Sequence, residues 1–241
     1  MPAGFLAVTS EPGKEVTLEE FQDWYNNEHV PLRLNHLKSF LNGARYTASD
    51  ALTPTWLALY DIDDTSTFQK PEYTRLRANR SPREADLVKR LALLDRRTYE
   101  ALEDSGPSPL TSSMDYSDHP SRGLITHGIA ETDAEAVKAW TREVVASLRT
   151  VDGWVRTRTF HCIDHLKTGL TVGAGPEAQV VPEYLGVHGE VSISYGITRS
   201  EGVRSAVDRA AASSGISIEE ERLWELFRVY PCIAQGNLPT A

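Results

Sequence analysis

The same order of strand-like and helix-like segments occurs twice in this chain, and this repeat limits the possible folds more than any single motif. Each half reads strand, helix, strand, strand, helix, strand. Between the halves, residues 104–120 are rich in Ser, Pro and Asp and show no hydrophobic periodicity, which is typical of a linker. We therefore predict an N-terminal repeat over residues 1–103 and a C-terminal repeat over residues 121–241.

Alternating apolar residues predict the strands of both halves, at residues 4–10, 40–49, 55–62, 95–102, 123–130, 154–163, 184–195 and 222–234. Three- and four-residue spacing predicts helices at residues 18–34, 66–91, 134–150 and 200–214. Pro31 is expected to end or kink the first helix. A βαββαβ unit forms a four-stranded antiparallel sheet with both helices on one face. Because the other face needs a cover, the predicted fold class is α+β, with two ferredoxin-like βαββαβ repeats forming an intramolecular dimeric α+β barrel.

The charge balance argues against two classes of partner. The chain holds 25 Lys and Arg against 34 Asp and Glu, a net charge of −9, which repels phosphate backbones and anionic lipids. Nucleic acid and membrane are therefore not expected partners, and no apolar run approaches the ~20 residues that cross a bilayer. The N-terminus lacks a basic segment followed by a long apolar one, which favours a cytoplasmic location. We expect a hydrophobic small-molecule substrate as the partner, and a homodimer is compatible with the pattern.

The first helix places one imidazole on an apolar face. Three- and four-residue steps align the side chains of Leu18, Phe21, Tyr25, His29 and Leu32. The helix C-terminus favours a charged His29 and burial favours a neutral one, so we expect its pKa to lie near neutrality. Such a histidine is suited to general acid–base catalysis. The alternative is a core histidine that is hydrogen-bonded to a backbone carbonyl.

Residues 18–62 carry a resemblance to a known family. The pattern is Phe21-x-x-Trp24-Tyr25-x-x-Glu28-His29-x-Pro31-x-Arg33, followed by Gly43-Ala44-Arg45-Tyr46 and Trp56-Leu57-Ala58-Leu59-Tyr60. It resembles the EthD-like branch of the dimeric α+β barrel superfamily, here as a tandem duplication. The resemblance implies a ferredoxin-like module whose relatives include cofactor-free decarboxylases, cyclases and isomerases, and proteins that bind haem or other small molecules. In the second repeat Val145 stands about where the family histidine would be, which suggests one chemical pocket per chain.

Polar side chains near His29 supply further candidates. The hydroxyls of Tyr25, Tyr46 and Tyr60 could orient a carbonyl or a phenolate, and Arg45 could hold a carboxylate through two parallel hydrogen bonds. Strand alternation sends Tyr46 and Arg45 to opposite faces, so at most one of them enters a cavity, and we favour Tyr46. Each tyrosine has the alternative role of a packed aromatic.

A second histidine comes from the other repeat. Flanking glycines allow close approach to His188, and its strand corresponds to the one that bears Tyr60. Glu190 lies two residues further on, hence on the same face, and could orient the ring. Packing is the alternative role for His188.

We interpret the chain as a cofactor-independent lyase, cyclase or isomerase that uses general acid–base chemistry on a hydrophobic oxygenated small molecule, such as a secondary-metabolite intermediate. The predicted catalytic residues are His29, Tyr25, Tyr46, Tyr60 and His188. The predicted substrate-binding residues are Phe21, Trp24, Trp56, Arg45 and Glu190. No metal or cofactor is expected. The alternatives are a haem-dependent enzyme with a histidine axial ligand and a non-catalytic small-molecule-binding or stress protein.

Overall fold

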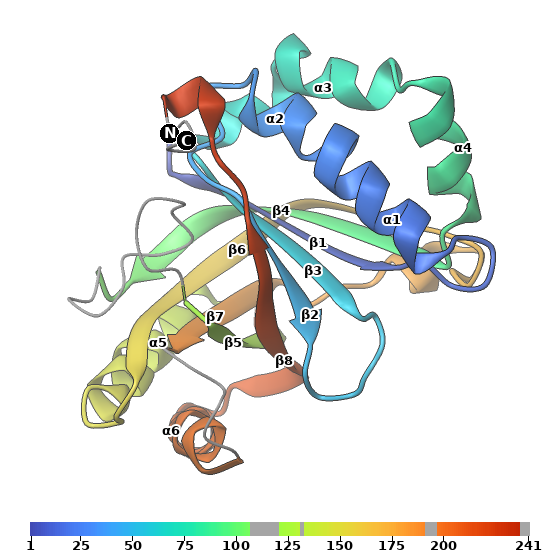
Figure 1. Ribbon diagram of the computed structural model, residues 1–241. Helices are drawn as coiled ribbons and strands as arrows, with labels where there is room; N and C mark the ends of the chain where they lie inside the picture. The colour runs from blue at the N-terminus through green and yellow to red at the C-terminus, as the bar shows by residue number, and fades with distance from the viewer. Residues whose placement is uncertain (107–120, 131–132, 191–196, 237–241) are drawn as a thin grey trace.

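Eight strands form one closed antiparallel barrel (Figure 1). The computed structural model describes residues 1–106, 121–130, 133–190 and 197–236, with only the backbone of residues 197–200. Most of the predicted linker and the end of the strand predicted at residues 184–195 therefore lie outside the described residues. Around the barrel the strands follow the order β1-β3-β2-β8-β5-β7-β6-β4.

The first half contains the strands β1 (Gly4–Glu11), β2 (Ala44–Ala48), β3 (Trp56–Ile62) and β4 (Leu93–Asp104). Its helical segments are α1 (Leu18–Trp24), the π-helix η1 (Tyr25–His29), α2 (Pro31–Leu34), the 3₁₀-helix η2 (Thr65–Gln69), α3 (Pro71–Ala78) and α4 (Pro82–Arg90). The second half contains β5 (Gly123–Ala130), α5 (Ala134–Leu148), β6 (Trp154–Thr168), the 3₁₀-helix η3 (Pro176–Gln179), β7 (Tyr184–Glu190), α6 (Ile197–Ser214), β8 (Ser217–Val229) and the 3₁₀-helix η4 (Ile233–Gln235).

The barrel is closed by pairing between the two halves. Within each half the strands lie in the ferredoxin-like order, β4-β1-β3-β2 and β8-β5-β7-β6. Strand β2 pairs with β8, and β4 pairs with β6. The edge strands of one sheet are thus hydrogen-bonded to those of the other, and neither sheet has a free edge. Figure 1 shows α1 to α4 on one side of the barrel and α5 and α6 on the opposite side. The predicted fold class is confirmed.

The barrel wall separates three apolar layers, because side chains alternate along each strand. The barrel lumen contains Phe5 stacked on Phe160, with 4.1 Å between ring centroids. The N-terminal layer lies between the first-half sheet and α1 to α4 and includes Trp24. The C-terminal layer lies between the second-half sheet and α5 and α6 and includes Trp140.

The first helix changes its winding instead of ending at one residue. At Val30 the backbone N–H donates to the carbonyl of Tyr25, five residues back, at 3.1 Å. Pro31 has no N–H to donate and occupies the first turn of α2, where none is needed. Pro31 therefore does not end the helical run, which continues to Leu34, and the irregularity lies before it, as the π-helical turn η1. Turns of this kind are frequent at functional sites.

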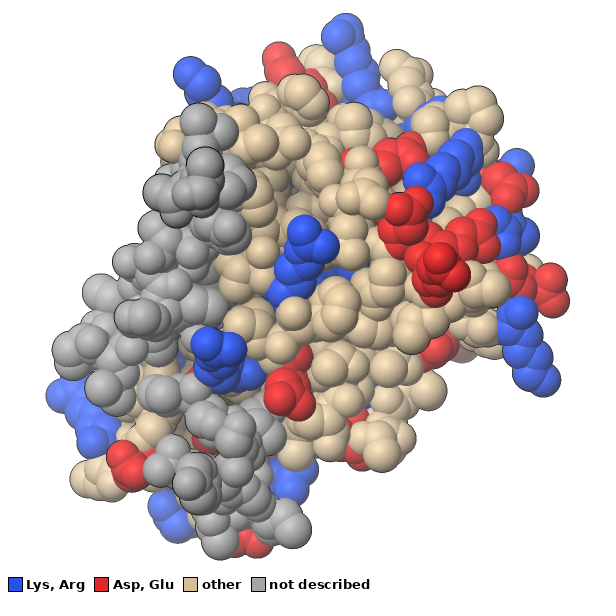
Figure 2. Space-filling model, viewed as in Figure 1, with Lys and Arg blue, Asp and Glu red and all other residues tan. Residues whose placement is uncertain are grey.

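The surface of the first-half helices carries mixed charge. Figure 2 shows acidic and basic side chains next to one another over this part of the molecule. Arg83 pairs with Asp23, and Arg90 pairs with Glu20. This mixture is typical of a solvated helix surface. Within the described part of the chain, no helix combines the length and apolarity needed to span a bilayer.

The shared lumen predicts that the two halves unfold together. Phe160→Ala should lower the free energy of unfolding by about 3–5 kcal/mol, because it removes a buried ring from the Phe5 stack. Urea titrations followed by tryptophan fluorescence and far-UV circular dichroism should still coincide in one transition. Ile163→Ala, at a position 41% exposed on the same strand, is the control and should change stability by less than about 0.5 kcal/mol. Two separated transitions would contradict a shared core.

Candidate functional site

The N-terminal layer brings together most of the predicted site residues. Its members are Phe21, Trp24, Tyr25, His29, Arg45, Trp56 and Tyr60. Alternation along β2 and β3 turns Arg45, Trp56 and Tyr60 toward the helices. The helical segments α1 and η1 supply the others. The sequence pattern thus predicted a group of side chains that do meet in space.

His29 forms a buried pair with a carboxylate from α4. Its Nδ1 lies 2.7 Å from Oε1 of Glu84, and the two residues are 8% and 2% exposed. The Trp24 and Tyr25 rings pack on the imidazole, at 4.5 Å and 5.1 Å between centroids. Among the described residues, Nε2 of His29 has no hydrogen-bond partner. This nitrogen is therefore the one available to a ligand.

Local structure at α4 explains where Glu84 points. Ser81 precedes α4, and its Oγ accepts a hydrogen bond from the backbone N–H of Glu84 at 3.0 Å. In this spacing the glutamate often caps its own helix. Here its carboxylate bonds to His29 instead, while the first turn of α4 favours its negative charge.

Burial sets the protonation state of the pair. It lowers the pKa of His29 to about 4, the nearby Arg33 charge adds to this effect, and the hydrogen bond to Glu84 offsets only part of it. For Glu84, burial alone would raise the pKa, but the hydrogen bond to His29 and neighbouring positive charges hold it below its usual value. At neutral pH the pair is therefore a neutral imidazole that donates Nδ1–H to a carboxylate.

The expectation of a near-neutral pKa for His29 was wrong for a structural reason. The chain continues from η1 into α2, so His29 does not lie at the free C-terminus that would favour its charged form. Arg33 donates a hydrogen bond to the carbonyl of His29 at 2.6 Å and places a positive charge beside it. Little therefore opposes the lowering of the His29 pKa by burial.

Arg45 is a buried cation in an aromatic enclosure. It is 1% exposed, and its guanidinium carbon lies 4.0 Å from the Tyr25 ring centroid. The rings of Trp56, Phe21 and Phe227 complete the enclosure, at 5.0, 5.2 and 5.4 Å. Its Nη1 donates to Gln22 at 2.6 Å and lies 3.4 Å from both the Asn26 amide oxygen and the Tyr230 hydroxyl, but within the described ranges Nε and Nη2 have no partner. Among the described residues no carboxylate pairs with Arg45.

Several neutral polar atoms of this layer also lack partners. They are the hydroxyls of Ser10, Tyr25 and Tyr60 and the indole nitrogen of Trp24. Burial raises the pKa of Tyr25 and of Tyr60, so both phenols stay protonated and can donate. Buried polar groups are normally hydrogen-bonded, and a cluster of exceptions calls for an explanation.

Three predicted site residues lie in other layers. Tyr46 points into the barrel lumen, where its hydroxyl donates to the carbonyl of Ser121 at 3.2 Å. His188 and Glu190 face the C-terminal layer, and Nδ1 of His188 lies 2.9 Å from Oγ1 of Thr157. The barrel wall separates these residues from His29, so the structure does not bring them into one site with it. Their catalytic roles stay predictions.

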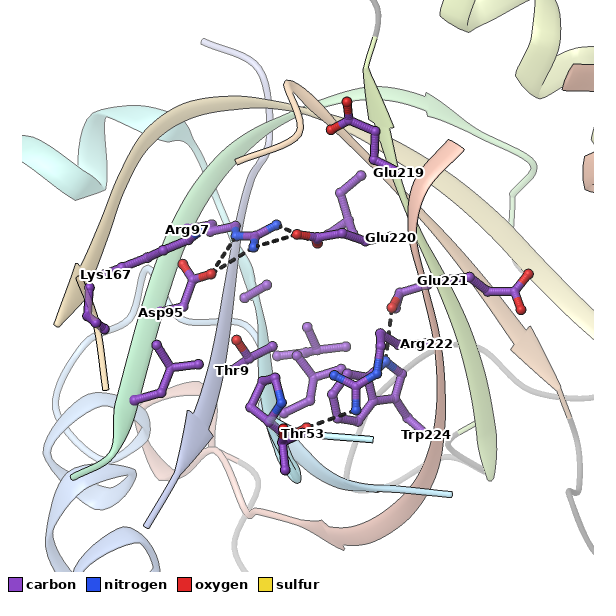
Figure 3. Close-up of a pocket in the computed structure, with 18 of the residues that line it drawn as sticks. Thr9, Thr53, Asp95, Arg97, Lys167, Glu219, Glu220, Glu221, Arg222 and Trp224 are labelled. Carbon is purple, nitrogen blue, oxygen red and sulfur yellow. Dashed lines mark hydrogen bonds and ion pairs between the residues drawn. The ribbon is translucent and has the colours of Figure 1, made fainter. Parts of the chain in front are cut away.

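The lumen opens at one end into a cavity of about 580 Å³ (Figure 3). Its lining includes apolar side chains from both halves and a group of charged residues at the mouth. There Arg97 bonds to Asp95 at 2.7 Å and to Glu220 at 3.0 Å. None of the predicted site residues lines this cavity.

Sequence reasoning missed the partners of the site residues and the lumen cavity. Glu84 is 55 positions from His29, and the spacing of α4 gave no sign of where its carboxylate points. Tyr230, whose hydroxyl lies 3.4 Å from Nη1 of Arg45, comes from the other half. The sequence did contain a signal for the cavity. Asp95 and Arg97 are two residues apart in a predicted strand, so their side chains lie on the same face.

The two predicted catalytic histidines are not placed to act as the axial ligand of a haem in the lumen cavity, because neither His29 nor His188 lines it. Within the described ranges, no three His, Cys, Asp or Glu side chains are grouped so that they could hold a metal ion.

The lowered pKa of His29 predicts acid sensitivity of the fold. A histidine whose pKa is lower in the folded state gives stability that is complete above about pH 6.5 and is lost as the pH falls toward 4. This loss should amount to about 3 kcal/mol and should be smaller in His29→Gln, which cannot titrate. Urea unfolding at pH 7, 5.5 and 4.5 measures it, with the exposed His36→Gln as control. Equal pH dependence in wild type and His29→Gln would contradict the assignment.

Comparison with known proteins supports the fold. No family model matches the sequence, and no curated protein matches it. An anthrone oxidase-like protein of known structure has a TM-score of 0.57 and 9% identity, covering 95% of this chain and 92% of that chain. A monooxygenase-like protein from Lactobacillus acidophilus has a TM-score of 0.50 and 10% identity, with coverage of 95% and 96%. A heme-binding protein from Thermus thermophilus has a TM-score of 0.50 and 10% identity, with coverage of 94% and 92%. At such low identity the likeness shows the fold alone, and that fold is the dimeric α+β barrel.

Proposed function

We propose that this protein is an enzyme that abstracts a proton from a hydrophobic oxygenated small molecule in the N-terminal layer, as a cofactor-independent lyase, cyclase or isomerase. The observation that carries the proposal is the buried Arg45 guanidinium, which has no carboxylate partner among the residues that the structure describes. The EthD-like character, a cytoplasmic location and a further homodimer remain predictions from the sequence.

An unpaired buried cation is costly unless something compensates its charge. Four aromatic rings, two amide oxygens and the Tyr230 hydroxyl contact Arg45, yet among the described residues nothing accepts from Nε or Nη2. An oxyanion, such as an enolate, a phenolate or a carboxylate, would satisfy both the charge and the donors. The unpartnered phenols of Tyr25 and Tyr60 are further donors in the same layer. The layer is thus suited to stabilising negative charge that develops on an oxygen atom.

His29 is suited to create that charge. Its Nε2 takes a proton from a carbon next to a carbonyl, and the electron pair of the C–H bond moves onto the carbonyl oxygen, where Arg45 binds it. Return of the proton to another carbon completes an isomerisation. Departure of a hydroxyl group, which takes the proton and leaves as water, completes a dehydration. Glu84 orients the ring through Nδ1. The Tyr25 ring contacts both His29 and Arg45.

Access to Arg45 requires movement, because its guanidinium is buried. Phe227 of β8 is 44% exposed and covers Arg45 on one side, while the π-helix η1 covers it on another. A substrate that reaches Arg45 must displace one of them. The enclosure would then exclude water from the reacting groups.

Oxidation is the second candidate. The same carbanion could pass electrons to O₂, so that a methylene becomes a carbonyl and water is released. The likeness to an anthrone oxidase-like protein favours testing this reaction. A non-catalytic binding protein is the remaining alternative.

Anthrone, 2-tetralone and 2-indanone are suitable probes because each carries an acidic methylene group and an oxygen. In D₂O at pH 7, NMR should show exchange of the methylene protons that is faster with the protein than without it, and an oxygen electrode should separate simple exchange from oxidation. His29→Gln should slow exchange by about 10²–10⁴-fold, and Arg45→Met by about 10²–10³-fold. His36→Gln is the matched control. Binding of the probes without any exchange would contradict an enzymatic role.

Stability measurements separate a catalytic Arg45 from a structural one. Arg45→Met removes an unpaired buried charge and fills the space with an apolar side chain, so the urea midpoint should not fall. A large loss of stability with unchanged exchange would make Arg45 a structural residue.

The pKa of His29 fixes the expected pH profile of exchange. Because Nε2 acts as a base, the rate should stay constant from pH 7 to about 5 and fall as the pH passes through about 4. Exchange rates are compared only where far-UV circular dichroism shows folded protein. A decline centred near pH 6.5 would contradict a buried His29 base.

A further inference from the structure

We propose that the lumen cavity is a second binding site, which takes a small amine with an apolar or aromatic body. This site lies on the other face of the first-half sheet from Arg45 and is independent of the function proposed above. Its volume of about 580 Å³ is within the range of ~300–1,000 Å³ that is typical of small-molecule sites.

The inner part of the cavity is apolar. Its walls include Ala7, Leu57 and Leu59 from the first half and Leu185 and Trp224 from the second. All five are less than 9% exposed. The indole nitrogen of Trp224 donates to Oγ1 of Thr126 at 2.9 Å, which fixes the ring as part of the wall. A flat apolar body fits such walls through burial of its surface.

The mouth of the cavity is crossed by an ion pair between opposite strands. Strands β4 and β8 lie four places apart in the ring of eight, so the Arg97–Glu220 pair spans the lumen. Figure 3 shows Arg97 between Asp95 and Glu220. Asp95 holds Arg97 from its own strand and is buried, whereas the Glu220 side chain is 43% exposed. Glu220 is therefore the member of this cluster that can move at low cost.

The charges that line the mouth favour a cation. Glu221 is paired outside the barrel with Arg204, and Arg222 is paired with Asp50. Three carboxylates remain in the lining, those of Asp95, Glu219 and Glu220. Two cations remain, Arg97 and Lys167. The Lys167 ammonium group donates to the carbonyl of Val180 at 2.5 Å. One negative charge is left over.

An unsatisfied acceptor points to the same conclusion. Asp95 is 4% exposed, Oδ2 bonds to Arg97, and in the part of the chain that the structure describes Oδ1 has no hydrogen-bond partner. A buried carboxylate oxygen requires a donor. A ligand ammonium group beside Oδ1 of Asp95, on the side away from Arg97, would supply that donor and balance the extra charge. Its apolar body would then extend toward Trp224.

Three matched probes test the charge preference by isothermal titration calorimetry. They are 2-naphthylmethylamine, 2-naphthylmethanol and 2-naphthoic acid, which share one ring system and differ in charge. The amine should bind saturably with one site per chain and at least about tenfold more tightly than the alcohol, and the acid should bind most weakly. Equal affinity for all three probes, or no saturable binding of the amine, would overturn the proposal.

Variants locate the binding. Asp95→Asn should weaken amine binding by at least about tenfold and change alcohol binding by less than about threefold. Asp164→Asn is the matched control, because Asp164 lies on the neighbouring strand β6 and pairs with Arg96, away from the cavity. Ala7→Leu should reduce binding of both probes, because the larger side chain fills the inner part of the cavity. If Ala7→Leu does not fold, Thr9→Leu tests the same point, since Thr9 also lines the cavity.

The outcome is distinguishable from that of the proposed enzymatic site. Arg45→Met should leave amine binding unchanged, since Arg45 does not line the cavity. Loss of amine binding in Arg45→Met, or unchanged binding in Asp95→Asn, would place the probe elsewhere and overturn the proposal.

Discussion

Strand pairing between the two halves is the constraint on which the rest of this structure depends. The β2–β8 and β4–β6 pairs turn two open sheets into one closed barrel. Without them each half would expose the apolar face that now forms the lumen, and each would keep two unpaired edges. Closure also assigns separate environments to the two faces of every strand. One face meets helices and the other meets the opposite sheet, so chemistry on the two faces can differ.

The N-terminal layer shows how burial shapes the chemistry available to a few side chains. His29 is kept neutral by its surroundings and oriented by Glu84. Arg45 is a buried cation, and none of the described carboxylates pairs with it. A neutral base and an uncompensated cation around one aromatic ring, Tyr25, form an arrangement that packing alone does not require.

The fold was predictable from the sequence because strand and helix periods are local properties. Much of the N-terminal layer was predictable too, since helical spacing places Phe21, Tyr25 and His29 on one face. Contacts between segments that are remote in sequence were not predictable, because nothing in the spacing says that Glu84 meets His29 or that Tyr230 approaches Arg45. The pKa of His29 was mispredicted for the same reason, as it depends on residues that are remote in sequence. Which residues meet in the site therefore becomes clear only from the arrangement of the strands and helices.

The π-helical turn η1 takes up one more residue than an α-helical turn would need, because a π-helix has a wider turn than the α-helix on either side of it. Removal of one residue within Tyr25–His29 would restore α-helical winding there, and α1 and α2 would keep nearly their present orientation, because the wide turn absorbs the extra residue. The barrel and the helices that cover it therefore do not need this residue. Its effect is confined to the segment Tyr25–His29 itself, where His29 meets Glu84.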